Sequence, residues 1–215
     1  KFMKLRKSLL KKSRVYLILD RPVFNKFTLK DIVSLTAHKE IGLIQLRDKF
    51  SAKEEVLKFA QKLAKQIGST KTLFIINDYV DVAVASLADG VHLGQEDLSL
   101  KQARKLLGQD KLIGVSCHNL TQALKAQQEG ADYIGIGPLY ATATKPGCAG
   151  IGLKVAAEVF AKIKIPCFAI GNIGEGNIEP MVAVGVKRIA VCRAILGANN
   201  PGGVTKRLYK QLKKI

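Results

Sequence analysis

The feature that most constrains the fold of this chain is a regular alternation between short apolar runs and longer segments with helical periodicity. Residues 42–47 and 72–76 are apolar runs with the length of buried strands. Residues 51–66 repeat their apolar positions with the period of a helix, and Ser51 with Glu54 forms a capping-box pattern at its start. Because parallel strands need long crossover connections, this alternation predicts a parallel sheet covered by helices.

The number of repeats and the chain length favour a closed barrel. About eight strand–helix units fit into the 215 residues, so we predict an α/β fold with a single (β/α)8 TIM barrel. An open, doubly wound sheet would show the same alternation, but no GxGxxG motif follows the first predicted strand, residues 15–19. We therefore assign residues 15–215 to one TIM-barrel catalytic domain. Residues 1–14 are expected to be a basic N-terminal extension or a leading strand, without the apolar core of a secretory signal.

The composition predicts a cytoplasmic globular protein, and its positive charge leaves the kind of anionic partner open. Thirty-five Lys and Arg residues against 17 Asp and Glu give a net charge of +18, which suits either nucleic acid or anionic substrates. Lysines such as Lys58, Lys62 and Lys65 recur at helical spacing, and no aromatic stacking motif accompanies them, so we expect no nucleic-acid binding. No apolar run is long enough to span a membrane. The oligomeric state is left open, and a homo-oligomer is compatible with the sequence.

Polar side chains stand at the end of the second predicted strand. In a barrel the C-terminal ends of all strands meet at one mouth, where catalytic residues gather. Gln45, Arg47 and Lys49 have the same parity in an extended segment, so their side chains face one way. Charges in a buried strand need a partner, and one amide with two cations suits a pyrophosphate. We therefore predict an anion site at this strand end.

Acidic residues follow the next two predicted strands. Asp78 comes directly after Asn77 at the end of the third strand, and Asp97 follows the fourth. Alone, either aspartate would more often cap a helix. Presented together from adjacent strand ends, opposite the cations, they favour Mg²⁺, which commonly uses one or two carboxylates together with substrate phosphates.

The loop at residues 137–150 combines hydroxyls, an ammonium group and glycines at the end of another apolar run. Thr142 and Thr144 have the same parity, so both hydroxyls face one way in an extended segment, and Lys145 adds a positive charge. This combination predicts contacts with a phosphate or pyrophosphate.

The ends of the fifth, seventh and eighth predicted strands carry further candidate substrate-binding residues. Ser116 follows the fifth strand with His118 close behind, and residues 171–174 and 191–193 follow the seventh and eighth. A glycine-rich loop before a helix offers backbone N–H groups to a phosphate. His92 alternates into the interior of the fourth strand, where we expect a structural role.

Six short motifs in register resemble thiamine-phosphate synthases, a family of TIM-barrel transferases. They lie at residues 45–49, 76–78, 92–97, 114–116, 142–145 and 170–171, and the resemblance extends from about residue 15 to residue 196. It implies a Mg²⁺-dependent coupling of an aminopyrimidine methyl pyrophosphate with thiazole phosphate, which gives thiamine phosphate and pyrophosphate.

The resemblance also implies roles for individual residues. The pyrimidine pyrophosphate would be held by Gln45, Arg47, Lys49, Asn77 and Lys145, Mg²⁺ by Asp78 and Asp97, the pyrimidine by Ser116, and the thiazole phosphate by Thr142, Thr144, Gly171 and the backbone of Val191 and Cys192. The cations Arg47, Lys49 and Lys145, with Ser116, would be catalytic. Departure of pyrophosphate would leave a carbocation-like pyrimidine methylene, which the thiazole nitrogen attacks, so no protein nucleophile is required.

The chain departs from the synthase pattern near the expected thiazole-phosphate site. Asn172 stands where the family usually has glycine, and Arg193 where it commonly has serine. The loop at residues 145–152 is shorter than in most synthases and is similar in length to that of the thiazole tautomerases related to TenI, in which a histidine near the position of His118 moves a proton. A tautomerase that uses His118 is therefore the alternative hypothesis.

Overall fold

Parallel strands close into a barrel, as the alternation predicts. The computed structural model describes residues 2–68, 70–141 and 150–214, and within these ranges eight strands pair in sequence order, with β1 also paired to β8. The strands are β1 (Val15–Asp20), β2 (Ile41–Arg47), β3 (Leu73–Asn77), β4 (Gly90–Leu93), β5 (Leu112–Cys117), β6 (Tyr133–Ile136), β7 (Cys167–Ile170) and β8 (Ile189–Val191). The predicted (β/α)8 TIM barrel is confirmed.

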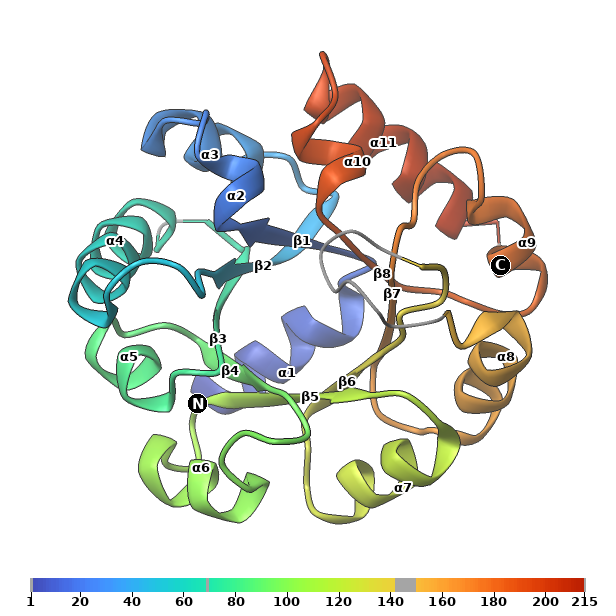
Figure 1. The fold of residues 1–215 in the computed structure, drawn as a ribbon, viewed down its shortest axis with the longest axis horizontal. Coiled ribbons are helices and arrows are strands. Elements are labelled where there is room, and N and C mark those ends of the chain that lie inside the picture. The colour runs from blue at the N-terminus through green and yellow to red at the C-terminus, as the bar shows by residue number, and fades with distance from the viewer. Residues whose placement is uncertain (1, 69, 142–149, 215) are drawn as a thin grey trace.

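Helices surround the barrel on its outer side (Figure 1). They are α2 (Arg21–Phe24), α3 (Leu29–Thr36), α4 (Lys53–Ile67), α5 (Val80–Ala85), α6 (Leu100–Leu107), α7 (Leu120–Gln128), α8 (Gly152–Lys162), α9 (Ile178–Ala183), α10 (Arg193–Leu196) and α11 (Pro201–Leu212). Across the described ranges, none of the helices combines the length and the apolar composition that crossing a membrane requires.

The predicted cap of α4 is wrong, whereas other helices are capped by their own side chains. Ser51 donates its backbone N–H to Asp48 Oδ1 at 3.0 Å, and α4 begins at Lys53 with Ala52 as the N-cap. By contrast, Ser99 caps α6 by accepting from the backbone of Gln102. The Asp48 carboxylate therefore binds the backbone just before α4, and Ser51 and Glu54 do not form a capping box.

Alternation of side chains along the strands creates two apolar layers. One face of each strand packs against the helices, as with Leu17 and Leu19 of β1. The other face fills the interior of the barrel with a separate cluster that contains Leu10, Tyr16, Ile18, Leu43, Leu73, Ile75, Leu112, Tyr133, Phe168 and Ala190. The interior is therefore a packed core toward the N-terminal ends of the strands, and among the described residues it opens toward their C-terminal ends.

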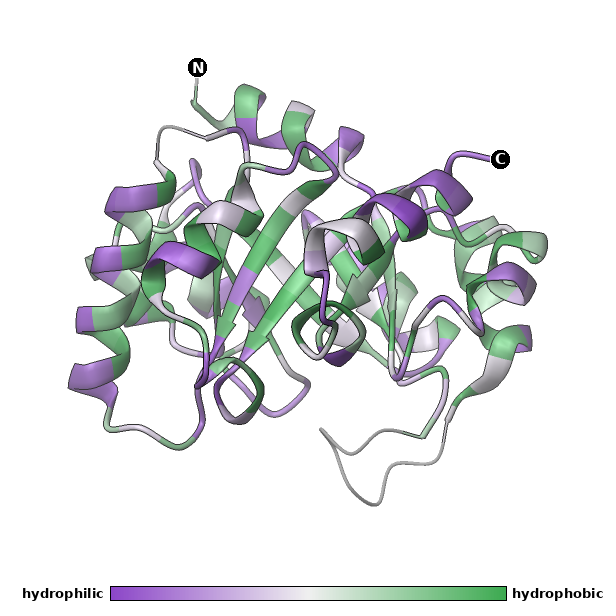
Figure 2. Ribbon diagram, turned by 90° about the horizontal axis from the view of Figure 1, so that it is seen from above, coloured by the Kyte–Doolittle hydropathy of each residue, from purple (hydrophilic) through white to green (hydrophobic). Residues whose placement is uncertain are grey.

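Most of the N-terminal segment is a helix, so the leading strand considered from the sequence is wrong. Helix α1 (Phe2–Lys12) lies over one end of the barrel (Figure 2). Its Leu10 is only 1% exposed and packs into the interior cluster, with Met3 and Leu9 against the same cluster. Met3, Leu9 and Leu10 thus close the barrel at the N-terminal ends of the strands, while the lysines of α1, together with Phe2 and Leu5, are exposed.

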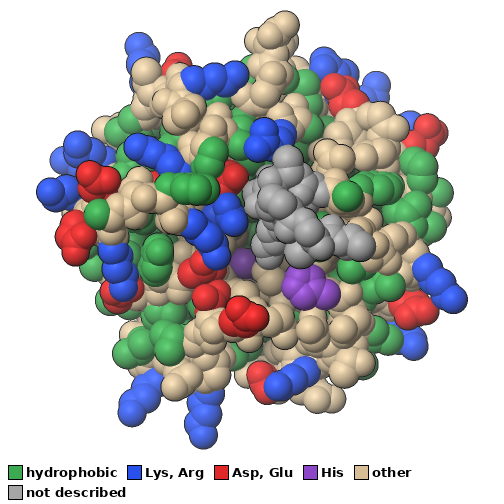
Figure 3. Space-filling view, viewed as in Figure 1, with side chains coloured by type: hydrophobic (Ala, Val, Ile, Leu, Met, Phe, Trp, Pro, Cys, Tyr) green, Lys and Arg blue, Asp and Glu red, His purple; other side chains and the backbone are tan. Residues whose placement is uncertain are grey.

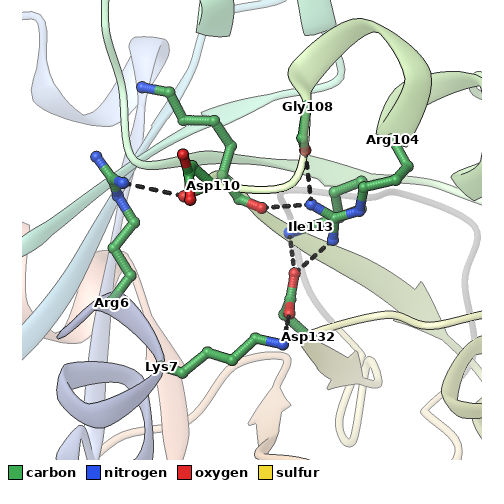
Figure 4. A network of polar contacts seen from close by, with 8 residues as sticks. Arg6, Lys7, Arg104, Gly108, Asp110, Ile113 and Asp132 are labelled. Carbon is green, nitrogen blue, oxygen red and sulfur yellow. Dashed lines mark hydrogen bonds and ion pairs between the residues drawn. The ribbon is translucent and has the colours of Figure 1, made fainter. Parts of the chain in front are cut away.

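Ion pairs hold α1 against the loops that precede β4, β5 and β6. Arg6 donates to Asp89 Oδ1 at 2.7 Å and to the carbonyl of Asp110 at 2.9 Å. Lys7 lies 3.1 Å from Asp132 Oδ1, and Arg104 of α6 donates to the other oxygen of the same carboxylate at 2.7 Å (Figure 4). The buried Asp132 therefore joins α1 to α6 and to the base of the sheet.

Replacing Arg6 by alanine is expected to destabilise the barrel by about 1–2 kcal/mol, because it removes a charged hydrogen bond to Asp89. For a chain of this size the melting temperature should fall by about 3–6 °C. Lys4→Ala, an exposed position on the same helix, is the control for lost helix charge. Equal melting temperatures for the two variants in a thermal unfolding scan would show that this ion pair does not hold α1 in place.

Candidate functional site

A cavity of about 640 Å³ opens at the C-terminal ends of the strands. Six of the residues predicted from the sequence line it: Gln45, Asn77, Ser116, Gly171, Val191 and Cys192. Tyr16, His92 and Phe168 form part of its wall on the barrel interior. On the same face of the molecule, basic and acidic side chains lie next to each other around the middle, with histidine side chains close by (Figure 3).

Arg47 is fixed at the mouth by an acid that the sequence analysis missed. Asp20, the last residue of β1, is opposite Arg47, the last residue of β2, and the two side chains form an ion pair. Asp20 is 3% exposed and the Arg47 side chain 14% exposed. Because a buried carboxylate holds the guanidinium in one orientation, Arg47 is positioned before any substrate arrives. The sequence did contain a signal for this contact, because Asp20 is an acidic residue directly after the apolar residues 15–19.

The second cation and the two predicted metal ligands meet at the ends of β2, β3 and β4. Lys49 Nζ lies 2.8 Å from Asp78 Oδ2, and Asp97 Oδ2 accepts from the backbone N–H of Gly94 at 2.6 Å. Asp78 has a positive φ of 62°, which turns the chain sharply after β3. Burial, followed by hydrogen bonding and repulsion from Asp78, raises the pKa of the Asp97 carboxyl. The sequence prediction that these two acids lie close together is confirmed.

Asp78 and Asp97 are suited to bind a divalent cation that takes its remaining ligands from water or substrate. Two crowded carboxyl groups raise the free energy of a doubly ionised site, which a divalent cation would lower. Within the described ranges, no cluster of three or more His, Cys, Asp and Glu residues could hold a metal ion. A cation at Asp78 and Asp97 would therefore complete its coordination with water or substrate oxygens, as Mg²⁺ commonly does.

On the side of β7 and β8, the cavity wall is formed where the backbone of Gly171 passes close to that of Pro138. Gly171 has a φ of 111°, and a Cβ atom there would lie 2.6 Å from Pro138 Cα, so only glycine fits. Asn172 follows with a φ of 50°, a conformation that asparagine tolerates, and its carbonyl accepts from Asn177 at 2.8 Å. Burial raises the pKa of the Cys192 thiol to about 11, so it lines the cavity as a neutral group.

Both histidines near the site line the cavity. His118 Nδ1 is hydrogen-bonded to the carbonyl of Gly137. His92 is buried inside β4, as the alternation predicts, but it also contacts Ser116 Oγ through Nε2 at 3.0 Å. The purely structural role expected for His92 therefore leaves out a contact with a predicted substrate-binding residue.

Three predicted residues cannot be placed. Thr142, Thr144 and Lys145 lie outside the described residues, as does most of the shortened loop.

The fold and the site together define a (β/α)8 barrel whose cavity, with charged side chains at the neighbouring strand ends, lies at the C-terminal ends of the strands, where barrel enzymes carry their active sites. Residues 15–195 match the family model described as thiamine monophosphate synthase. The chain belongs to this family.

Known proteins with related sequences carry the same description. The thiamine-phosphate synthase of Gloeobacter violaceus is 45% identical over 81% of this chain and 51% of its own length. That of Clostridium acetobutylicum is 37% identical over 94% of this chain and 95% of its own length. A solved thiamine phosphate pyrophosphorylase from Pyrococcus furiosus superposes with a TM-score of 0.83 at 32% identity and covers 98% of both chains. The chain spans about half the length of several of the curated relatives it matches.

Proposed function

We propose that this chain is a thiamine-phosphate synthase, which joins an aminopyrimidine methyl pyrophosphate to thiazole phosphate and releases pyrophosphate. The observation that carries the proposal is that two cations, Arg47 and Lys49, and two acids, Asp78 and Asp97, stand at the C-terminal ends of β2, β3 and β4, beside a cavity of about 640 Å³. Family membership and the names of the relatives support the same activity.

The charged side of the mouth would bind the leaving group. Arg47, held by Asp20, and Lys49 would contact pyrophosphate oxygens, and Lys145 would add a third cation. Asp78 and Asp97 would hold Mg²⁺, which when bound offsets the charge on the pyrophosphate. Lys49 is paired with Asp78, so substrate binding would exchange this ion pair for contacts with a pyrophosphate oxygen and the cation.

The cavity would hold the two reacting rings. Gln45, Asn77 and Ser116 line it on the side of β2, β3 and β5, and Gly171, Val191 and Cys192 line it on the side of β7 and β8. The first set would bind the pyrimidine pyrophosphate and the second, with Thr142 and Thr144, the thiazole phosphate. As the bond from the methylene to pyrophosphate oxygen breaks, the thiazole nitrogen would attack the electron-poor carbon. The wall would keep the two rings in line and exclude water.

Release of pyrophosphate tests the proposal. The wild-type protein should release pyrophosphate only when the aminopyrimidine pyrophosphate, thiazole phosphate and Mg²⁺ are all present, and Asp97→Asn should be strongly impaired. Glu96→Gln, an exposed neighbour of Asp97, is the matched control. Pyrophosphate release without thiazole phosphate, or full activity in Asp97→Asn, would overturn the proposed function.

Asp97→Asn should also change stability in opposite directions with and without Mg²⁺. Because the pKa of Asp97 is raised in the fold, its stabilising contribution is present below its usual pKa and is lost as pH rises through its folded pKa. At neutral pH and without metal, the ionised carboxyl group therefore opposes folding, and we expect Asp97→Asn to melt at a higher temperature than wild type. Mg²⁺ should raise the melting temperature of wild type but not of the variant. A lower melting temperature for the metal-free variant would contradict the account of Asp97.

A thiazole tautomerase is the second candidate, because His118 lines the same cavity and its Nδ1 is held by the carbonyl of Gly137. That activity would need no metal and should be lost in His118→Ala. Under the synthase proposal, His118→Ala should retain Mg²⁺-dependent pyrophosphate release.

A further inference from the structure

The two cations expected to contact the leaving group from β2 are held by their acidic partners in different ways. Lys49 pairs with Asp78 while 48% of its side chain is exposed, and Asp78 is also a proposed Mg²⁺ ligand. Arg47 pairs with Asp20, and these two side chains are only 14% and 4% exposed. The pair at Lys49 is therefore open to water and to substrate, whereas the pair at Arg47 is enclosed by protein.

The backbone holds Asp20 and Arg47 together. They are the last residues of β1 and β2, and they are direct partners in the register of these two parallel strands. Asp20 also stands at the N-cap position of the short helix α2, but within the described part of the chain its side chain makes no capping hydrogen bond. The carboxylate is therefore not used to cap a helix, and it accepts from Nη1 of Arg47.

The pair formed by Asp20 and Arg47 lies beside the cavity. Cys192, which follows β8, lines the cavity wall. Burial raises the pKa of its thiol to about 11, and the opposing influences include a backbone hydrogen bond from Asp20 and the charge of Arg47. Because β1 pairs with both β2 and β8, Asp20 holds the guanidinium of Arg47 at the rim where these three strands end.

A guanidinium held in one orientation is most useful where negative charge develops during a reaction. A guanidinium has five N–H donors in a fixed plane, so one carboxylate can hold it while other donors remain for substrate. Donors that already point at the developing charge need no reorganisation in the transition state. A displacement of such a group by about 1 Å can lower a rate by about a hundredfold. Orientation therefore matters more for turnover than for the affinity of the bound substrate.

We propose that Asp20 is a positioning residue that holds Arg47 in place throughout turnover. Arg47 then stabilises the charge on the departing pyrophosphate, which takes the electron pair of the broken bond between the methylene carbon and oxygen. Lys49, which exchanges its acidic partner when substrate binds, contributes mainly to substrate affinity. The inference rests on the proposed function and deepens it, because it gives the two cations different tasks and adds Asp20 to the residues on which the rate depends.

The proposal is tested by Asp20→Asn, which keeps the size of the side chain and removes its charge. Steady-state kinetics of pyrophosphate release should show a kcat about a hundredfold lower than that of wild type. The KM for the aminopyrimidine pyrophosphate should change by less than about threefold, because Arg47 keeps its positive charge. A kcat close to that of wild type, or a loss that lies entirely in KM, would overturn the proposal.

Asp132→Asn is the matched control for a loss of stability. Asp132 precedes β6 at the opposite end of the barrel and pairs with Arg104, and these side chains are 3% and 17% exposed, almost the same as at Asp20 and Arg47. The control should melt at a lower temperature than wild type and keep its kcat. An equal fall of kcat in Asp132→Asn would show that the rate follows stability, and the positioning role would be wrong.

Asp20→Glu keeps the ion pair and so guards against a variant that fails to fold. The added methylene group displaces the guanidinium of Arg47 without removing the charge of its partner. We expect kcat to fall by about tenfold or more, with KM nearly unchanged. Full turnover by Asp20→Glu would mean that the charge of Asp20 matters and its position does not, which contradicts the proposal.

A double-variant cycle shows whether Asp20 acts through Arg47. Once Arg47→Gln has removed the guanidinium, adding Asp20→Asn should lower kcat by less than about twofold. A further loss of about tenfold would show a role of Asp20 that does not pass through Arg47, and the inference would fail. Wild-type protein that releases no pyrophosphate would remove the proposed function together with this inference. Normal wild-type turnover with an unaffected Asp20→Asn would remove the inference alone.

Discussion

Replacing Asp78 by asparagine is expected to lower the rate of pyrophosphate release by about a thousandfold. The substitution removes one of the two carboxylates proposed to hold Mg²⁺ and the partner of Lys49. Asparagine tolerates the φ of 62° at this position, so the turn after β3 should be preserved and the loss should be electrostatic rather than conformational.

Steady-state kinetics at several Mg²⁺ concentrations measure this effect. Asp81→Asn is the matched control, because Asp81 is also acidic, lies on the adjacent helix α5 and pairs with Lys53 at 2.5 Å, and its side chain is 64% exposed. The control should keep nearly full activity. If Asp78→Asn keeps more than about a tenth of the wild-type rate at saturating Mg²⁺, this carboxylate does not stabilise the departing pyrophosphate.

Gly114→Ala is expected to produce the largest loss of stability, about 3 kcal/mol. The added methyl group would lie 2.1 Å from Tyr133 Cζ, and the Tyr133 ring is fully buried against Phe168 and hydrogen-bonded through its hydroxyl. Neither the strand nor the ring can move without breaking other contacts. For a chain of this size the melting temperature should fall by about 6–12 °C.

Thermal unfolding of single and double variants separates this collision from a general strand effect. Gly108→Ala is not a suitable control because Gly108 has a positive φ of 75°, whereas Gly176→Ala adds a methyl group with no heavy atom within 4 Å. Gly176→Ala should therefore change stability little. Combining Gly114→Ala with Tyr133→Leu should recover part of the loss, since the smaller side chain makes room for the methyl group. A melting temperature for Gly114→Ala close to wild type would contradict this account of the interior.

The barrel could be predicted because its signals are local and repeated. Each buried strand is an apolar run, and parity along β2 places Gln45 in the interior, where it is 4% exposed. Asp78 and Asp97 could be expected to meet because adjacent parallel strands end at the same rim. These inferences depend on the geometry of strands and need no knowledge of distant contacts.

The errors arise where tertiary contacts decide the outcome. The basic charge of residues 1–14 concealed the pattern that places Met3 and Leu10 against the barrel interior, so the helix α1 was not expected. The capping box at Ser51 failed because Asp48 binds the backbone there. The buried hydrogen bond between the hydroxyls of Tyr16 and Tyr133 joins residues 117 positions apart, and nothing in the local sequence marks such a contact.

The central claim is that Arg47, Lys49, Asp78 and Asp97 form one site for a magnesium-bound diphosphate. Calorimetric titration with inorganic pyrophosphate, with and without Mg²⁺, tests it most directly. We expect wild type to bind pyrophosphate in a Mg²⁺-dependent manner and Asp97→Asn to bind it about tenfold more weakly or worse. Equal affinity with and without Mg²⁺, or undiminished binding by Asp97→Asn, would contradict the claim.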